Sequence, residues 1–245
     1  MVKKRYIIIS GAYSDLAKDV LQELSDYNLI LIGKSPSKLL KIKSKIKKTK
    51  IISLSMDTTD EKLSENIVKI CKKKKIKIYG AINFVGQHSF LPLKIIDYKN
   101  FQTIYKNNVF GLINLLKFFS KYEKYFEAKS SIINISSVSS LKGNKSISLY
   151  SSSKAASNNL VKSYALELSS KGVRINSIIL GHFEKGMSKE TKKFLNAQQI
   201  LELRHKHPLG FGKIKSLVGG IKFLLNSEND WITGINLNID GGYSA

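Results

Sequence analysis

The chain of 245 residues is 42% hydrophobic and 24% charged, and its 41 Lys and Arg against 18 Asp and Glu give a formal net charge of +23. This length and composition fit one α/β domain with its own core. The single cysteine, Cys71, excludes an internal disulfide framework and suits a reducing compartment. No run approaches the roughly 18 apolar residues that span a bilayer, so we expect a cytoplasmic protein without a membrane span.

The positive charge is carried almost entirely by lysine, since only Arg5, Arg174 and Arg204 are arginines. Base readout and bidentate phosphate contacts favour arginine. The interleaving of aromatic and basic residues that binds single strands is also missing from the sequence. We therefore expect a solvated lysine-rich surface and no specific nucleic-acid partner, with weak, salt-sensitive binding to polyanions.

Apolar strand-like runs alternate with amphipathic helical stretches along the chain. Such alternation predicts an α/β fold with a parallel sheet covered by helices on both faces. Right-handed crossovers make it a doubly wound, Rossmann-type sheet of about seven strands. The predicted strands are Tyr6–Ser10, Leu29–Gly33, Ile51–Met56, Ile78–Phe84, Ser131–Ser136, Arg174–Leu180 and Asn236–Ile239, and the predicted helices lie near 15–25, 37–48, 60–74, 98–121, 151–171 and 213–226.

One segment, 183–207, has no place in that sheet. It is polar, with a helical portion over Ala197–Leu203, and follows the sixth predicted strand. Long connections of this kind are commonly functional. We predict a substrate-covering lid within a single domain spanning 1–245.

Tyr150 and Lys154 lie four residues apart near the start of the fifth predicted helix, and Tyr150 follows Ser137 by thirteen residues. An i, i+4 pair shares one helix face. A nearby cation favours the phenolate, so we expect Lys154 to lower the pKa of Tyr150 from its ordinary value of about 10. The trio predicts acid/base catalysis. A nucleophilic role for Ser137 is disfavoured, because no Gly-x-Ser-x-Gly elbow surrounds it.

With these residues, the chain resembles the short-chain dehydrogenase/reductase family over essentially its full length. The likeness is greatest to 3-oxoacyl-(acyl carrier protein) reductases. Motifs occur in the family's order: Ser10-Gly11-Ala12-Tyr13-Ser14-Asp15-Leu16-Ala17 at the cofactor turn, Asp57-Thr58 after the third strand, Asn83-Phe84-Val85-Gly86, Asn107-Asn108, then Ser137, Tyr150 and Lys154, and Ile239-Asp240-Gly241-Gly242 near the end.

The resemblance implies a role for each catalytic position. Tyr150 would exchange a proton with the carbonyl or alcohol oxygen while hydride passes from or to a nicotinamide. Ser137 would hydrogen-bond the same oxygen. Lys154 would bind the nicotinamide ribose and lower the Tyr150 pKa. Asn108 would hold a water that links Lys154 to solvent, with Asn107 as the neighbouring register.

The family's cofactor-binding positions also carry over to this chain, and no metal site is expected. The cofactor contacts implied by the resemblance are Gly11, Tyr13, Ser14, Asp15, Leu16, Lys34, Asp57, Thr58, Asn83, Val85, Gly86, Tyr150, Lys154, Gly181 and Phe183.

The cofactor turn departs from the family's Gly-x-x-x-Gly-x-Gly, which here reads Gly11, Asp15 and Ala17. Gly11 keeps the tight turn. Asp15 puts an anion near a helix N-terminus that would receive a pyrophosphate. We expect Asp15 to point away and to interact with the helix dipole. Later in the chain, Lys185 stands where the family has the Thr that contacts the carboxamide.

The choice of cofactor depends on the end of the second predicted strand. NAD-preferring relatives carry an acidic residue there, whereas a basic residue accommodates a 2′-phosphate. This chain has Gly33, with no acid, followed by Lys34 and Ser35. We predict NADP(H) in preference to NAD(H).

Four histidines are present. The resemblance places His88 and His182 at the rim of the cleft, where either contacts substrate or only packs. His205 and His207 are spaced i, i+2 without an acidic or cysteine companion, which disfavours a metal site.

The leading hypothesis is an NADP-dependent carbonyl reductase of the short-chain type, with a 3-oxoacyl thioester on a carrier protein as one substrate. Lys129 and Lys171 are candidates for contacting an acidic carrier. A sugar or nucleotide-sugar oxidoreductase is the alternative enzyme. A non-catalytic dinucleotide-binding or interaction protein is the alternative of another class; the altered glycine turn favours it and the four filled catalytic positions oppose it.

The resemblance also implies a homotetramer in which the helices 98–121 and 151–171 pack between subunits. Large apolar side chains on and beside these helices would supply the contact surface or would belong to the core instead. They are Phe118, Phe119, Tyr122 and Tyr164.

Overall fold

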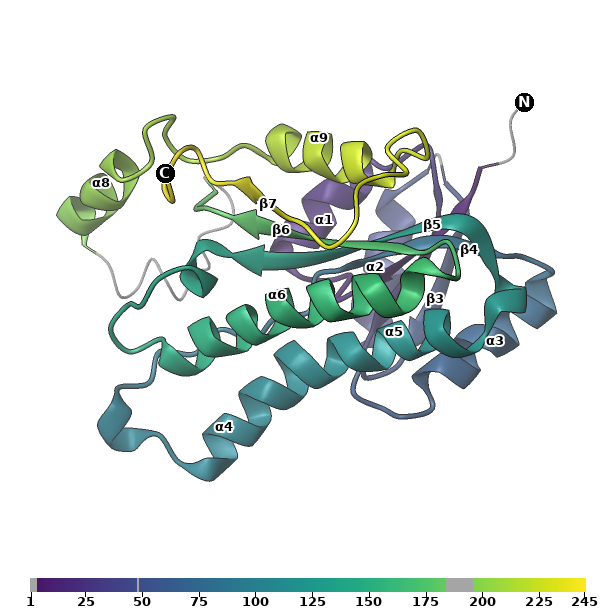
Figure 1. The fold of residues 1–245 in the computed structure, drawn as a ribbon, viewed down its shortest axis with the longest axis horizontal. Coiled ribbons are helices and arrows are strands. Elements are labelled where there is room, and N and C mark those ends of the chain that lie inside the picture. The colour runs from purple at the N-terminus through teal and green to yellow at the C-terminus, as the bar shows by residue number, and fades with distance from the viewer. Residues whose placement is uncertain (1–3, 48, 184–195) are drawn as a thin grey trace.

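The computed structural model describes residues 4–47, 49–183 and 196–245. They form one seven-stranded parallel sheet (Figure 1). The strands are β1 (Tyr6–Ser10), β2 (Asn28–Gly33), β3 (Ile51–Ser55), β4 (Ile78–Asn83), β5 (Phe126–Ser137), β6 (Arg174–Leu180) and β7 (Asn236–Ile239). Their order is β3-β2-β1-β4-β5-β6-β7, which confirms the predicted doubly wound architecture. The order reverses between β1 and β4, and ligands of such sheets bind at that point, outside the carboxyl ends of the strands.

Helices cover both faces of the sheet (Figure 1). One face carries α1 (Asp15–Gln22), α2 (Pro36–Lys45) and α9 (Ile214–Leu225), and the other carries α3 (Leu63–Lys74), α5 (Gly111–Lys121) and α6 (Ser148–Ser169). α4 (Tyr98–Tyr105) packs against α6, and α8 (Ala197–His205) lies off the sheet. Short 3-10 turns span Leu93–Ile95, Glu123–Tyr125 and Val138–Ser140.

The apolar runs are continuous because each strand is buried from both sides. In β1, Ile7 and Ile9 pack into the core under α1, α2 and α9, whereas Ile8 packs into the core under α3, α5 and α6. Successive side chains of a strand point to opposite faces, so a strand covered on both faces needs apolar residues at every position.

The structure differs from the predicted elements in three places. The single predicted helix 98–121 is α4 and α5 joined by a π-helical turn, Lys106–Phe110. The helix that carries Tyr150 begins at Ser148, so Tyr150 lies in its first turn. β5 extends back to Phe126. Of the predicted lid, residues 184–195 lie outside the described part of the chain, and α8 is helical as predicted.

The apolar side chains considered for a subunit interface are partly core. Phe118 and Phe119 are fully buried under the sheet, where they pack with Phe126, so of the two alternatives left open these two residues belong to the core. The homotetramer stays a prediction. Exposed apolar side chains on the helices in question are Tyr98, Phe101 and Leu166.

No helix among the described residues is both long enough and apolar enough to cross a membrane.

A row of buried polar side chains crosses the sheet on the face that α6 covers. Ser10 of β1 donates to Asn83 Oδ1 of β4 at 2.7 Å, and Asn83 Nδ2 donates to Asn134 Oδ1 of β5 at 3.0 Å. Asn134 Nδ2 continues toward the hydroxyls of Ser157 on α6 and Ser177 on β6. The four strand residues are aligned by the strand register. Because buried polar groups need partners, the row fixes how the strands meet just below their carboxyl ends.

Asn134→Ala should lower the free energy of unfolding by about 1–3 kcal/mol, because it leaves buried donors and acceptors on both neighbouring strands without partners. Urea unfolding monitored by circular dichroism measures the change. Asn238→Ala is the matched control: Asn238 is exposed, and among the described residues its side chain bonds only Ser244, so its effect should stay within about 0.5 kcal/mol. Equal effects of the two substitutions would contradict a structural role for the row.

Candidate active site

The predicted site residues converge at the carboxyl ends of the strands. The turns after β1, β2 and β4 carry Gly11, Lys34 and Gly86, and β5 and β6 end at Ser137 and just before Gly181. Parallel strands bring these ends to one edge. The first turns of α6 add Tyr150 and Lys154, so residues scattered over most of the chain meet at one place.

Tyr150 is hydrogen-bonded to the side chain of Ser137. Burial raises the pKa of Tyr150 above its ordinary value, and the Ser137 hydrogen bond opposes that shift only in part. Without a bound cofactor, the protein's own groups therefore do not lower the pKa of Tyr150, since desolvation outweighs them. Ser137 is itself oriented at the start of a 3-10 turn, where its hydroxyl accepts the backbone N–H of Ser139 at 3.2 Å.

Lys154 is buried between the ends of β4 and β5. Its Nζ donates to the carbonyl oxygen of Ile135 at 2.9 Å and lies 3.5 Å from that of Val85. Gly86 makes room for the ammonium, because a Cβ there would lie 2.9 Å from Nζ. Burial lowers the pKa of Lys154 to about 8. The ammonium is thus bound to backbone carbonyls at the edge of the cleft.

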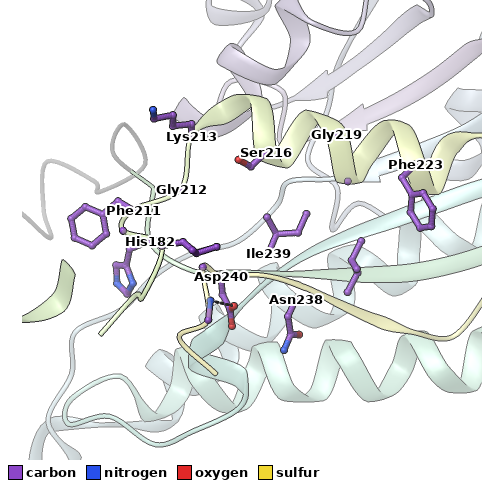
Figure 2. A pocket seen from close by; sticks show the side chains of 16 residues that line it. His182, Phe211, Gly212, Lys213, Ser216, Gly219, Phe223, Asn238, Ile239 and Asp240 are labelled. Atoms are coloured by element: carbon purple, nitrogen blue, oxygen red, sulfur yellow. Dashed lines mark hydrogen bonds between the residues drawn. The ribbon is translucent and has the colours of Figure 1, made fainter. Parts of the chain in front are cut away.

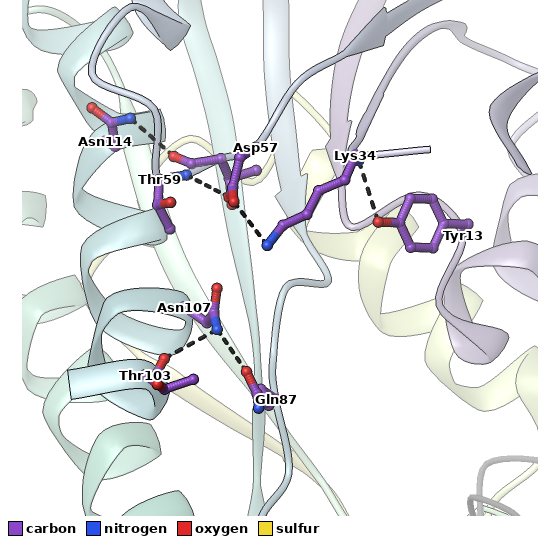
Figure 3. A network of polar contacts seen from close by, with 9 residues as sticks. Tyr13, Lys34, Asp57, Thr59, Gln87, Thr103, Asn107 and Asn114 are labelled. Carbon is purple, nitrogen blue, oxygen red and sulfur yellow. Dashed lines mark hydrogen bonds and ion pairs between the residues drawn. The ribbon is translucent and has the colours of Figure 1, made fainter. Parts of the chain in front are cut away.

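Asn108 rather than Asn107 faces the interior. In the π-helical turn, Asn108 Oδ1 accepts the N–H of Gln87 at 2.6 Å, and Nδ2 donates to Gln87 O at 3.0 Å and to Ser153 Oγ at 2.9 Å. Asn107 bonds the Gln87 side chain and the carbonyl of Thr103 nearer the surface (Figure 3). Asn108 therefore joins the segment after β4 to the helix of Tyr150, and its role in holding a water stays a prediction.

The cofactor turn brings two backbones into close approach. Gly11 has φ +69°, and a Cβ on it would lie 2.9 Å from the backbone of Phe84 and Val85, so only glycine fits. Ser14 caps α1 by accepting the N–H of Ala17 at 3.2 Å. Asp15 is exposed and pairs with Lys18 at 2.8 Å, which agrees with the expectation that it points away. Leu16 is half-buried against the core.

The end of β2 is covered by Tyr13 (Figure 3). The Tyr13 ring fills the space that a side chain at Gly33 would need, and its hydroxyl accepts the N–H of Lys34 at 3.2 Å. Lys34 Nζ lies 2.7 Å from Asp57 Oδ2. Burial works to raise the pKa of Asp57, but hydrogen bonds from Lys34 and Thr59 lower it overall. Two residues expected to contact the cofactor separately are thus an ion pair.

The remaining predicted positions contribute mainly backbone. A Cβ at Gly181 would lie 2.8 Å from Asp240 Cα. The side chain of Phe183 is buried in the core, and its backbone forms a bridge with Gly212, so the predicted contact at Phe183 is limited to main-chain atoms. Thr58 is buried as well, and its carbonyl accepts from Asn114 Nδ2 at 2.9 Å.

Aromatic rings lie beside Tyr150, at the cleft rim where the sequence resemblance placed His88 and His182. The His88 ring lies 4.3 Å from the Tyr150 ring, centroid to centroid. Across the cleft, His182 and His207 pack with Tyr243 near the C-terminus. Nothing in the sequence links position 243 to this site, so only its folded position reveals it. Among the described residues, no three His, Cys, Asp or Glu side chains gather as a metal site requires.

A second hollow, also absent from the sequence reasoning, lies between α9 and β7 (Figure 2). It has a volume of about 700 Å³ and reaches from His182 to Phe223. Its walls are mostly apolar and glycine residues, and its polar members are His182, Lys213, Ser216, Asn238 and Asp240. It borders the end of β6 from the side opposite Tyr150.

The fold and this site define an oxidoreductase of the short-chain dehydrogenase/reductase type. Residues 25–244 match the family described as Enoyl-(Acyl carrier protein) reductase, and the chain belongs to this family of short-chain dehydrogenases/reductases.

The chain is similar to the 3-oxoacyl-(acyl-carrier-protein) reductase FabG of Buchnera aphidicola subsp. Baizongia pistaciae (strain Bp), with 28% identity over 250 residues that cover 98% of this chain and 97% of the relative. A solved structure described as ElxO with NADP bound has 28% identity and a TM-score of 0.85, covering 98% of this chain and 99% of that chain. A short-chain type dehydrogenase/reductase from Mycobacterium ulcerans has a TM-score of 0.89 and covers 98% and 90% of the two chains; at 22% identity, that likeness concerns the fold alone.

Lys154→Met should remove a pH dependence of stability. The pKa of Lys154 falls from 10.5 to about 8 on folding, so the unfolded chain binds more protons between these values and wild-type stability rises with pH there. At about 1.4 kcal/mol per unit, wild type should gain on the order of 3 kcal/mol relative to the variant. Urea unfolding of both proteins between about pH 7 and pH 10.5 measures this. A stability difference between the two proteins that stays constant over this pH range would contradict the lowered pKa of Lys154.

Proposed function

We propose that the protein reduces a carbonyl to an alcohol, or catalyses the reverse, with NADP(H) as the hydride carrier. The observation that carries the proposal is the Tyr150 phenol, hydrogen-bonded to Ser137 and one helical turn before the buried Lys154. Carbonyl reduction needs a proton donor and an oriented oxygen. The chain offers both at the edge of the sheet where such folds bind nucleotides.

The site fits a dinucleotide because its floor lacks side chains where a cofactor would lie. Gly11, Gly86 and Gly181 occur at the ends of three strands, and backbone atoms leave no room for a Cβ at Gly11 and Gly181. The N-terminus of α1 faces the turn after β1 and suits a pyrophosphate. Bound there, the nicotinamide would supply or accept the hydride.

Tyr150 would donate the proton. Because burial raises its pKa, the phenol is protonated at neutral pH, which is the state that reduction requires. Ser137 would donate a second hydrogen bond to the same oxygen and fix its position.

Lys154 and Asn108 would support the proton donor. An ammonium has three N–H donors, and Ile135 and Val85 account for two at Lys154. The third is suited to a ribose hydroxyl. Asn108 ties the backbone of Gln87 to Ser153, and the Ser153 hydroxyl in turn donates to the carbonyl of Tyr150 at 2.8 Å. This chain of bonds holds Tyr150 in place.

The preference for NADP(H) rests on the end of β2. Gly33 offers no carboxylate, and Tyr13 fills the space where one would stand. Lys34 is the nearest cation, although its pairing with Asp57 means that a 2′-phosphate would compete with that carboxylate. The similarity to ElxO with NADP bound supports the same choice.

A 3-oxoacyl thioester on a carrier protein is the substrate class that the named relatives support. The lysines considered for an acidic carrier are weaker candidates than the sequence suggested. Lys129 pairs with Asp230 and Lys171 with Glu123, so part of their charge is already neutralised. We therefore assign carrier docking to neither lysine.

Tyr150→Phe should reduce kcat for NADPH oxidation by a ketone by about 100-fold to 10,000-fold, because it removes the proton donor. Tyr164→Phe is the control, since Tyr164 lies on the same helix α6 but away from the cleft. The substrate panel contains a 3-oxoacyl thioester free and on a carrier protein, a keto-sugar, and an enoyl thioester. Equal activity of the two variants, or reduction of the enoyl thioester alone, would sink the proposal.

Lys34→Ala should weaken NADPH binding by about tenfold while changing NADH binding little, because it removes the cation nearest a 2′-phosphate. Titration by fluorescence measures both dissociation constants. Lys45→Ala, in the last turn of α2, serves as the control for lost surface charge. An equal loss for both cofactors would mean that Lys34 acts through Asp57 and not on the phosphate.

A further inference from the structure

The imidazole of His207 is buried, with only 2% of its surface exposed, and both of its nitrogens are engaged. Nε2 lies 3.1 Å from the backbone nitrogen of His182, and Nδ1 lies 2.8 Å from the carbonyl oxygen of Leu203. A backbone N–H only donates and a carbonyl only accepts. His207 is therefore neutral, carries its proton on Nδ1, and accepts at Nε2.

The group that His207 binds belongs to the segment Gly181–Phe183, immediately after β6. Both polar backbone groups of His182 are held by one stretch of chain, because its carbonyl accepts the N–H of Gly212 at 2.8 Å. Phe183 forms a backbone bridge with the same Gly212. The N–H of Gly181 is held from the other side by Ile239 at 3.1 Å. Figure 2 shows His182, Gly212 and Ile239 around this end of the sheet.

Aromatic packing fixes the His207 ring. It stacks on Tyr243 with 4.6 Å between centroids and meets the edges of Phe211 and His182 at 5.5 and 5.2 Å. The carbonyl of His207 accepts the N–H of Gly210 at 2.7 Å, which tightens the turn that leads to Phe211. The acceptor at Nε2 is thus rigidly placed.

We propose that His207 is a positioning residue for the nicotinamide end of the cofactor: its Nε2 holds the backbone of Gly181–Phe183 in the shape that the cofactor contacts. This rests on the proposed function, which assigns that segment to the cofactor. The segment's own side chains do not hold its backbone: Gly181 has none, the Phe183 ring is turned into the core, and Nδ1 of His182 has no hydrogen-bond partner among the described residues. Loss of the acceptor leaves the N–H of His182 without its hydrogen-bond partner, and the segment Gly181–Phe183 is then free to shift.

Two substitutions separate the two hydrogen bonds of the ring. In His207→Gln, the terminal amide reaches the position of Nε2 and accepts from His182. In His207→Asn, the shorter amide reaches the position of Nδ1 and keeps the bond to Leu203 only. Both variants are uncharged and both lose the stacking on Tyr243, so a general packing effect changes them alike.

We expect His207→Asn to raise KM and Kd for NADPH by about tenfold with little change in kcat, and His207→Gln to stay within about threefold of wild type. Hydrogen exchange of the His182 amide, followed by NMR without cofactor, gives a second readout. That amide should be protected in wild type and in His207→Gln, and should exchange fast in His207→Asn.

Thermal midpoints show whether the variants are folded, and His207→Phe, which keeps a ring and removes both nitrogens, replaces His207→Asn if the latter does not fold. Equal NADPH affinity and equal amide exchange in the Gln variant and the acceptor-free variant would overturn the role of His207. Wild-type protein that binds no NADPH would instead contradict the proposed function, while the amide exchange would still report on the hydrogen bond.

Discussion

The ammonium of Lys154 is buried at the ends of β4 and β5, bound to the carbonyl oxygen of Ile135 and close to that of Val85. A buried charge is destabilising unless polar groups surround it, and burial accordingly lowers the pKa of Lys154 to about 8. The rest of the site depends on this placement. Glycine at position 86 leaves space for the ammonium, because a Cβ there would lie 2.9 Å from Nζ. The start of α6 has to lie against the ends of the strands, and this brings Tyr150, one turn earlier, to Ser137.

Such a placement requires a rigid frame, and buried polar side chains provide it. The row that runs from Ser10 through Asn83 to Asn134 aligns three strands and reaches α6 through Ser157. The π-helical turn aims Asn108 inward, toward the backbone of Gln87. In both cases an amide side chain satisfies donors and acceptors of separate segments, so a shift of either segment leaves buried groups unpaired. Stability and catalytic geometry therefore depend on the same hydrogen bonds.

The fold followed from the sequence because its signals are local. Continuous apolar runs marked the strands, and the i, i+4 spacing placed Tyr150 and Lys154 on one helix. The site was predictable in composition but only partly in detail. Lys34 and Asp57, assigned separate cofactor contacts, form an ion pair, and this pairing depends on how β2 and β3 end side by side. His207, considered from the sequence only for a metal site and disfavoured there, is a buried acceptor for the backbone of His182.

The sequence by itself determined the apolar runs that become strands, the candidate site residues Ser137, Tyr150 and Lys154, and the glycine of the tight turn at position 11, because periodicity and spacing act over a few residues. Only the tertiary structure decided whether the pKa of Tyr150 is raised or lowered. The direction of the Tyr150 pKa shift depends on how much water the assembled core excludes, and no pattern along the chain encodes that. The same holds for Phe118 and Phe119, whose helix surface becomes core only once the sheet lies against it. Burial is a property of the whole fold.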